Sequence, residues 1–157
     1  MVIDPPQGGK KEKERMKKLF AAACAAILAL SAFAFAACAP KTVVVDEETQ
    51  YIIIKPDSKI LELTSETTLL DYMAVLKERK EIDYTVDNGM VMSINGTENP
   101  ADWSSCWMLY TDDTENVNPS LTIKYNEKSY SQTNFGAGEV IAKAGCTYIW
   151  VYQSFSF

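Results

Sequence analysis

The expected fold is decided by one segment, residues 68–80, which reads Thr68-Leu69-Leu70-Asp71-Tyr72-Met73-Ala74-Val75-Leu76-Lys77-Glu78-Arg79-Lys80. Its apolar residues are spaced three and four apart, which places them on one face of a helix. They are Leu69, Tyr72, Met73 and Leu76. Ser65 or Thr67, just before this segment, can cap the helix with a side-chain oxygen. Beyond residue 38 no other segment has this pattern, so we expect a single main helix.

The segments on either side of this helix have the composition of strands. Residues 51–54 are β-branched and aromatic, and 60–63 alternate apolar and polar, so we expect a hairpin that turns at 55–58. After the helix we expect strands at 84–86, 90–94, 107–110, 121–125, 129–131 and 147–155. Turn signals at 87–89, 95–96 and 126–127 separate several of them. One helix on one face of a mixed or antiparallel sheet predicts an α+β, β-grasp-like fold.

The N-terminus has the layout of a secretory signal. Lys17 and Lys18 precede an uncharged apolar run, 21–35, which is shorter than the ~20 residues that span a bilayer. The run ends in Phe35-Ala36-Ala37-Cys38, which resembles the lipobox of bacterial lipoproteins, where the cysteine receives diacylglycerol and becomes the new N-terminus. Cys38 is therefore the candidate lipidation site. The alternatives are an ordinary signal peptide and an uncleaved anchor helix.

This layout divides the chain into three parts. Residues 1–37 are leader and lipoprotein signal peptide, and 1–15 lie upstream of Met16, which we expect to be the true start. Residues 38–50 are a tether in which 43–45 can begin a strand. Residues 51–157 form one domain. The expected location is extracytoplasmic, with the mature chain anchored by lipid to the membrane at the bacterial cell surface.

The composition of the mature chain excludes several function classes. Removal of residues 1–37, which hold six basic and three acidic residues, leaves 9 Lys/Arg and 18 Asp/Glu and a net charge of −9. Such a surface repels phosphate backbones, so nucleic acid is not expected as a partner. Histidine is absent, which excludes catalysis by Ser-His-Asp or Cys-His and histidine-based zinc sites. Since no phosphate-binding or catalytic motif is present either, we do not expect an enzyme.

Two smaller features leave alternatives open. Cys106 and Cys146 follow Cys38 and can form a disulfide outside the cell, or remain as two buried free thiols. Their spacing fits no metal motif. The acidic, Asn-rich segment 112–119 is expected to be a loop; it lacks the full ligand set of a calcium-binding loop, so no metal site is expected there and a solvated loop is favoured.

The last expected strand alternates between aromatic and aliphatic side chains. One face carries Tyr148, Trp150 and Tyr152. The other carries Ile149, Val151 and Gln153. If the aliphatic face packs under the helix, the aromatic row lies on the open face as a ligand platform, and Trp107 or Tyr110 extends it. Alternatively, the segment 112–135 covers the open face and makes a second small core.

Four motifs resemble a known family in their order and spacing. They are Thr68-Leu69-Leu70-Asp71-Tyr72-Met73, Val91-Met92-Ser93-Ile94-Asn95-Gly96, Cys106-Trp107-Met108-Leu109-Tyr110 and Tyr148-Ile149-Trp150-Val151-Tyr152. Together they resemble the transcobalamin-like C-terminal domain, a member of a soluble-ligand-binding β-grasp superfamily, over roughly 51–155. In the vitamin B12 carriers of animals the corresponding domain forms one wall of the cobalamin site. A separate helical barrel, which this sequence lacks, forms the other wall.

The resemblance implies a surface lipoprotein that binds a soluble ligand, with a cobalamin-like corrinoid as the candidate. It would capture the ligand or deliver it to an uptake system such as a transporter. The alternative is a structural or adhesive module that binds protein or cell-wall glycan at the cell surface. No resident cofactor is expected in either case.

Overall fold

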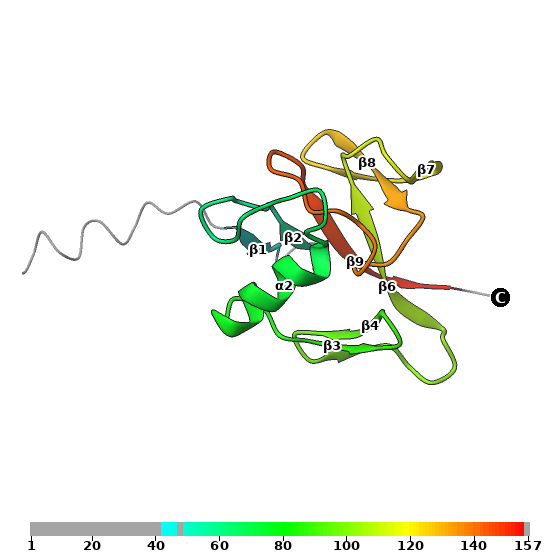
Figure 1. Ribbon diagram of the computed structural model, residues 1–157. Coiled ribbons are helices and arrows are strands. Elements are labelled where there is room, and N and C mark those ends of the chain that lie inside the picture. The colour runs from blue at the N-terminus through cyan, green and yellow to red at the C-terminus, as the bar shows by residue number, and fades with distance from the viewer. Residues whose placement is uncertain (1–41, 47–48, 156–157) are drawn as a thin grey trace, which may run out of the picture. The chain divides into compact units, whose positions relative to one another are not determined.

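The computed structural model of this chain describes residues 42–46 and 49–155 (Figure 1). The expected signal peptide and the lipidation site at Cys38 lie outside the described residues. Within them the chain forms two antiparallel sheets and one helix, which confirms the α+β class. The helix is α2 (Leu69–Glu78).

The larger sheet has six strands in the order β1-β2-β9-β6-β8-β7. In that order they are β1 (Val43–Val45), β2 (Ile52–Ile54), β9 (Tyr148–Ser154), β6 (Ser105–Thr111), β8 (Lys128–Thr133) and β7 (Val117–Tyr125). The smaller sheet joins β3 (Tyr84–Asp87), β4 (Met90–Ile94) and β5 (Thr97–Glu98) in that order. β7 begins at residue 117, inside the segment 112–119 that sequence patterns indicate as a loop, so only the first part of that segment is a loop.

Helix α2 confirms the expected helical face and corrects its cap. Its four buried side chains are Leu69, Tyr72, Met73 and Leu76. Neither Ser65 nor Thr67 is the cap, because Thr68 occupies that position. The Thr68 hydroxyl accepts a hydrogen bond from the Asp71 N–H at 3.1 Å, and the Asp71 carboxylate accepts one from the Thr68 N–H at 2.9 Å. The Thr68 hydroxyl also donates to the Asp71 carboxylate at 2.7 Å, and this bond, together with the one from the Thr68 N–H, holds the pKa of Asp71 below its ordinary value.

Three tight turns form where the sequence predicts them. Asn88-Gly89, Asn95-Gly96 and Asn126-Glu127 each have two consecutive residues with positive φ, between 46° and 83°. This conformation matches the twist of the two strands that such a turn joins. The turns connect β3 to β4, β4 to β5 and β7 to β8.

The expected hairpin between 51–54 and 60–63 is wrong. The partner of β2 is β1, with Val43 opposite Ile54, so part of the segment predicted as tether belongs to the sheet. Residues 60–63 form no strand. Their apolar side chains Ile60, Leu61 and Leu63 are half-buried against the core from an irregular segment. An apolar–polar alternation indicates which side chains are covered, but a strand also needs a free partner edge, and β1 and β9 occupy both edges of β2.

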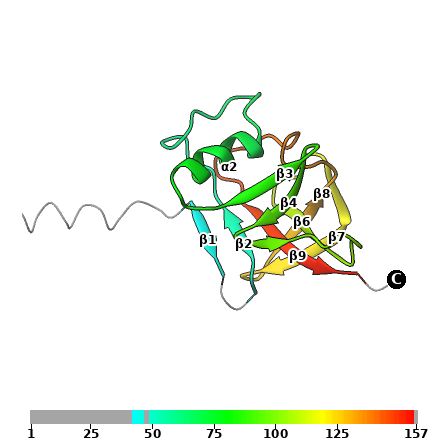
Figure 2. The same cartoon turned by 90° about the horizontal axis from the view of Figure 1, so that it is seen from below.

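Strands β2, β9 and β6 of the six-stranded sheet are covered on both faces, because the β7–β8 hairpin at the sheet's own edge bends over one of these faces (Figures 1 and 2). On one face α2 and the β3–β4–β5 sheet enclose the larger apolar cluster, which includes Tyr72, Ile94, Trp107 and Trp150. On the other face the β7–β8 hairpin contributes Tyr130 and Ile123 to a smaller cluster. The smaller cluster also contains Ile53, Tyr110, Ile149 and Val151. The segment predicted to cover an open face therefore covers the aliphatic face of β9.

Candidate functional site

The aromatic row of β9 lies in the interior, under the helix. Tyr148 has no exposed side-chain surface and Trp150 is only 4% exposed, and both belong to the cluster that contains the buried face of α2. Ile149 and Val151 lie on the opposite face, under the β7–β8 hairpin. The condition for an open aromatic platform, aliphatic side chains packed under the helix, is therefore not met: the aromatic side chains Tyr148 and Trp150 are the ones under the helix.

Polar groups at the tips of this row hold the covering segments in place. The Tyr148 hydroxyl donates to the Ile141 carbonyl at 2.8 Å and accepts from the Lys143 N–H at 3.1 Å. At the other end of the row the Tyr152 hydroxyl donates to the Glu98 carbonyl at 2.8 Å. Tyrosine suits these positions because its ring packs in the apolar layer while its hydroxyl bonds to backbone groups of the covering segments, which are half-buried at Tyr148 and exposed at Tyr152.

Of the two residues proposed to extend the row, Trp107 does so and Tyr110 does not. The Trp107 ring lies 5.3 Å from the Tyr152 ring, and its indole N–H donates to the Thr97 carbonyl at 2.9 Å. Tyr110 is buried in the cluster on the other face, where its hydroxyl donates to the Gln153 side chain at 2.9 Å. The five aromatic residues therefore form structural contacts on two faces of one sheet.

Cys106 and Cys146 are half-buried free thiols, so of the two alternatives the structure shows the free thiols and not the disulfide. Cys106 is opposite Gln153, whereas Cys146 precedes Tyr148, which is opposite Thr111 at the far end of β6. The five residues from Cys106 to Thr111 span about 17 Å of strand, and a disulfide needs Cα atoms within about 7 Å. Burial raises the pKa of both thiols above the ordinary value.

The three acidic residues of the loop after β6 are paired with two lysines. Lys128 Nζ lies 2.6 Å from a carboxylate oxygen of Asp112, which also accepts the Thr147 N–H at 2.7 Å. Lys143 Nζ lies 2.7 Å from Asp113 and 2.6 Å from Glu115. These ion pairs fix the loop against the segment that leads into β9. Hydrogen bonds to the two carboxylates raise the pKa of Lys143 well above its ordinary value.

A cleft beside this loop is too small for a macrocyclic ligand. Its lining includes Asp113, Lys143 and Phe135, and its volume is about 40 Å³. A volume of that size holds only a few water molecules, at roughly 10–15 Å³ each. A second, open depression of about 370 Å³ lies near the end of α2 and is lined by charged residues such as Lys80 and Glu81. The cleft has one aromatic lining residue, Phe135, and the open depression has none, whereas corrinoid binding is expected to need a larger aromatic surface.

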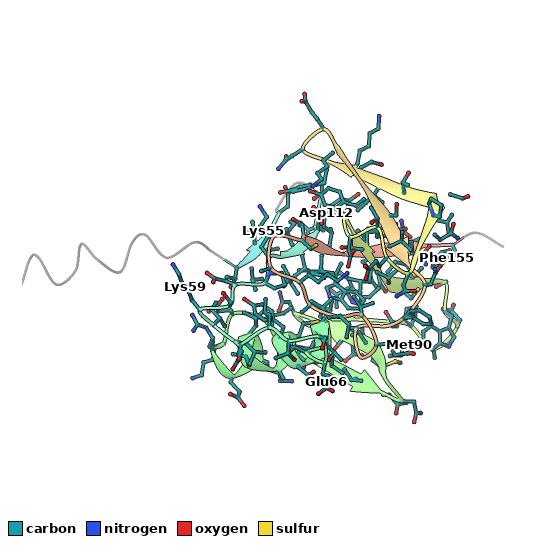
Figure 3. All side chains as sticks on the ribbon, turned by 45° about the horizontal axis from the view of Figure 1, so that its top comes forward. Lys55, Lys59, Glu66, Met90, Asp112 and Phe155 are labelled. Atoms are coloured by element: carbon teal, nitrogen blue, oxygen red, sulfur yellow. The ribbon has the colours of Figure 1, made fainter. Side chains whose placement is uncertain are left out.

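The described residues do expose aromatic side chains at one end of β9. Trp103 is 43% exposed and Phe155 is 39% exposed. The two residues lie on neighbouring backbone segments, because the Phe155 N–H donates to the carbonyl of Ser104, the residue after Trp103, at 2.8 Å. Figure 3 shows Phe155 at the side of the molecule away from Lys55 and Lys59. We call Trp103 and Phe155 together the aromatic tip.

The loop that carries Trp103 is held by hydrogen bonds of two side chains. The Asn99 side chain donates to the Val91 carbonyl at 3.0 Å and accepts the Trp107 N–H at 3.1 Å, which links the loop to both sheets. The Asp102 carboxylate accepts from the Ser104 N–H and hydroxyl at 3.0 and 2.8 Å, and these bonds lower its pKa. Trp103 has a φ of +56°, a conformation that costs a bulky residue about 1–3 kcal/mol.

The aromatic tip was not among the residues proposed from the sequence. Trp103 lies in a polar loop between Asp102 and Ser104, and Phe155 follows the last strand. The available signal was the polar setting itself, since a tryptophan outside any apolar pattern has no core position to fill. The alternation of side chains along the strands instead indicates the aromatic residues of β6 and β9, which pack in the core.

Comparison with protein-family models, with curated proteins and with solved structures gives no match for this chain. None of the helices in the described part of the chain is long and apolar enough to cross a membrane.

Proposed function

We propose that this protein is an exported bacterial lipoprotein, anchored through Cys38, whose single domain binds a ligand outside the membrane. The support is the order of a basic segment, an apolar run too short to span a bilayer, and small residues before Cys38. In this proposal β1 begins five residues after the anchor. The β-grasp relationship to transcobalamin-like domains belongs to the same proposal, since it rests on the four ordered sequence motifs.

The anchor can be tested with a matched pair of cysteine variants. Cells that express the full chain are fed an alkyne-labelled fatty acid, and the label on the protein is measured. We expect Cys38→Ser to abolish the label and Cys24→Ser to retain it, because Cys24 lies in the segment that is removed. Equal labelling of both variants would refute the anchor.

We further propose that the aromatic tip is the binding surface and that its ligand is a cell-wall glycan. The observation that carries this proposal is Trp103, an exposed tryptophan kept at positive φ on a loop fixed to both sheets. Strained backbone persists where the surrounding structure maintains it, and it concentrates at binding sites. A rigid, exposed aromatic ring suits the flat face of a sugar because little side-chain freedom is lost on binding.

The position of the tip agrees with this role. β9 begins at Tyr148, which is paired through Ile54 with Val43 at the start of β1. It ends at Ser154, next to the aromatic tip. Six residues of strand separate the two ends, about 20 Å at roughly 3.3 Å per residue. The tip therefore lies at the end of the sheet opposite the point where the tether enters, and an anchor at Cys38 leaves it accessible.

The binding proposal can be tested with soluble peptidoglycan fragments. The lipid-modified protein is titrated in detergent, and binding is followed by calorimetry and tryptophan fluorescence. We expect Trp103→Ala to weaken binding at least about 30-fold, the effect of losing a central aromatic anchor. Leu121→Ala, which removes a 49% exposed apolar side chain from β7, should bind like the unaltered protein. Equal affinity in Trp103→Ala and Leu121→Ala would exclude the tip as the site.

The soluble-ligand function implied by the transcobalamin resemblance stays a separate proposal. It predicts saturable binding of cyanocobalamin or cobinamide, for capture or for delivery to an uptake system. The ligand would have to bind at the surface, because the row that includes Trp150 is buried. Titration of both corrinoids in the same assay decides between the two proposals. Heat from the corrinoids and none from the glycan fragments would favour the soluble ligand.

A further inference from the structure

Basic residues of this acidic chain gather at one corner of the domain. Residues 38–157 contain nine Lys/Arg, of which Lys41 lies outside the described residues. Five of the other eight lie at the end of β2, in the turn after it, and at the end of α2. They are Lys55, Lys59, Lys77, Arg79 and Lys80. We call these five residues the basic corner.

The basic corner lies beside the start of β1. Because β1 belongs to the sheet, the part of the expected tether that precedes the sheet is residues 38–41. Lys55 directly follows β2, and its N–H donates to the Thr42 carbonyl at 2.8 Å. The Thr42 hydroxyl donates to the Glu81 carboxylate at 3.3 Å, which brings the end of α2 to the same place. Lys55 and Lys59 both lie on the side of β1 and β2, away from Phe155 (Figure 3). The residue that follows the tether is therefore in contact with both parts of this corner.

Three of these cations have no ion pair within the described residues. Lys77 is paired with Asp83 at 2.9 Å and Arg79 with Glu81 at 2.6 Å, whereas Lys55, Lys59 and Lys80 are exposed and make no such pair. By contrast, Lys128 and Lys143 are held by the acidic loop after β6. The cations left available for an outside partner are thus concentrated beside the tether.

The tether is too short to separate this corner from a membrane. Four residues lead from Cys38 to Thr42, and even fully extended they span at most about 14 Å. The negative potential of a membrane rich in anionic lipid decays over a Debye length of roughly 8–10 Å at physiological salt. A lipid on Cys38 therefore keeps the basic corner within or close to that potential.

We infer that the basic corner docks on anionic phospholipid headgroups, so that the domain lies on the membrane in one orientation with the aromatic tip directed outward. The inference rests on the proposed lipidation of Cys38. Each basic residue close to such a surface raises the fraction of time that the corner spends at the membrane by a factor of about five. The overall charge of −9 repels the same surface. One orientation is thereby favoured over uniform contact, because three of the four described lysines without an ion pair lie at this corner and the fourth, Lys124, lies on β7.

The acidic loop lies at the same end of the sheet but farther from the tether. Asp112 follows Thr111 at the end of β6, three strand positions from β1, or about 14 Å at roughly 4.8 Å per strand. Its carboxylates are paired with lysines, and Lys128 and Lys143 leave one uncompensated negative charge among three acids. Because the tether is short, it brings the basic corner closer to the membrane surface than the acidic loop.

Lysine labelling of the lipid-modified full-length product tests this inference. The protein is reconstituted into vesicles of phosphatidylcholine alone, or into vesicles with about a third phosphatidylglycerol. A membrane-impermeant amine reagent is added, and labelling is read by mass spectrometry. We expect Lys55, Lys59 and Lys80 to be labelled about fivefold more slowly on the anionic vesicles, relative to Lys124 on β7. High salt should remove the difference.

A pair of variants shows whether the corner acts as a unit. In Lys55→Gln/Lys80→Gln the protection of Lys59 should be lost, whereas Lys124→Gln should keep it. Equal labelling ratios on the two kinds of vesicle would overturn the docking surface while leaving the anchor intact, provided that the protein floats with the vesicles. A protein that does not float would overturn the anchor and the docking surface together.

Discussion

The two faces of β9 are both buried, but they are covered in different ways. The face with Tyr148, Trp150 and Tyr152 lies under α2, the small sheet and irregular segments. The face with Ile149 and Val151 lies under the β7–β8 hairpin. The segments packed on the aromatic face direct backbone carbonyl groups towards it. The aliphatic face is packed against the β7–β8 hairpin, whose strands are hydrogen-bonded to each other.

This difference explains the placement of the side chains. A loop laid over a sheet brings backbone polar groups that need partners, and a tyrosine hydroxyl supplies one without a charge. A strand hairpin satisfies its own backbone, so aliphatic residues suffice beneath it. The aromatic residues of β9 thus mark the face with the less regular cover and do not by themselves indicate a ligand.

The largest expected effect is on the centre of the aromatic face. Trp150→Ala should lower the free energy of unfolding by about 3–5 kcal/mol, because a large side chain with 4% exposure is replaced by a cavity. Ile149→Ala, on the other face, should lower it by roughly 2–4 kcal/mol. Urea unfolding followed by circular dichroism measures both. A loss below about 1 kcal/mol for Trp150→Ala would show that the aromatic face is open after all.

A smaller effect is expected from the hydroxyl groups on the two faces. Tyr148→Phe leaves the Ile141 carbonyl and the Lys143 N–H without their partner, and should lower the free energy of unfolding by about 2 kcal/mol. Tyr110→Phe removes a bond to the half-buried Gln153 side chain, which can turn towards water, so about 0.5–1 kcal/mol is expected. Equal losses in the two variants would contradict the proposed difference between the covers.

The same tyrosine should make stability depend on pH. Burial raises the pKa of Tyr148 to about 12, whereas an unfolded tyrosine titrates near about 10. The folded state therefore keeps its proton where the unfolded state loses it. This contribution is complete below about pH 10 and is lost as the pH rises towards 12. Urea midpoints measured at increasing alkaline pH should fall less steeply in Tyr148→Phe than in the unaltered protein.

The helix cap should contribute less to stability than the side chains at the centre of either face. Thr68→Ala removes the hydroxyl that accepts the Asp71 N–H and should lower the free energy of unfolding by about 1 kcal/mol. Ser65→Ala provides the control, because Ser65 is exposed and lies outside the cap that the structure shows. Comparison of their urea midpoints tests the cap. An equal loss in Ser65→Ala would mean that the helix begins earlier in solution.

Local signals made much of this fold predictable. The three- and four-residue spacing around Tyr72 and the turn residues Asn88-Gly89 act over a few positions, and both formed as expected. The choice of face on β9 is not local. Both faces are apolar, so either could pack under the helix, and only the complete arrangement of the covering segments decides. For the same reason the pairing of β1 with β2 could not be separated from a hairpin with 60–63.

The candidate site was missed for a related reason. Sequence patterns identify aromatic residues in strands most readily, and those at 107, 110, 148, 150 and 152 prove to be structural contacts. Trp103 lies in a loop with no periodicity, and its exposure depends on the hydrogen bonds of Asn99 and Asp102. Similarly, Cys106 and Cys146 are compatible with a disulfide in sequence, but the strand register places them at opposite ends of β6.

The smallest expected change in stability is also the sharpest test of the aromatic tip. Trp103→Gly removes an exposed side chain and places glycine at a φ of +56°, which glycine adopts without strain. Relief of about 1–3 kcal/mol of strain is offset by the greater freedom of glycine in the unfolded chain, about 0.5–1 kcal/mol. The urea midpoint should therefore stay equal or rise, while binding of the glycan fragments is lost. A fall of more than about 1 kcal/mol would instead make Trp103 part of the core, because its ring would then contribute more packing energy than the strained backbone costs.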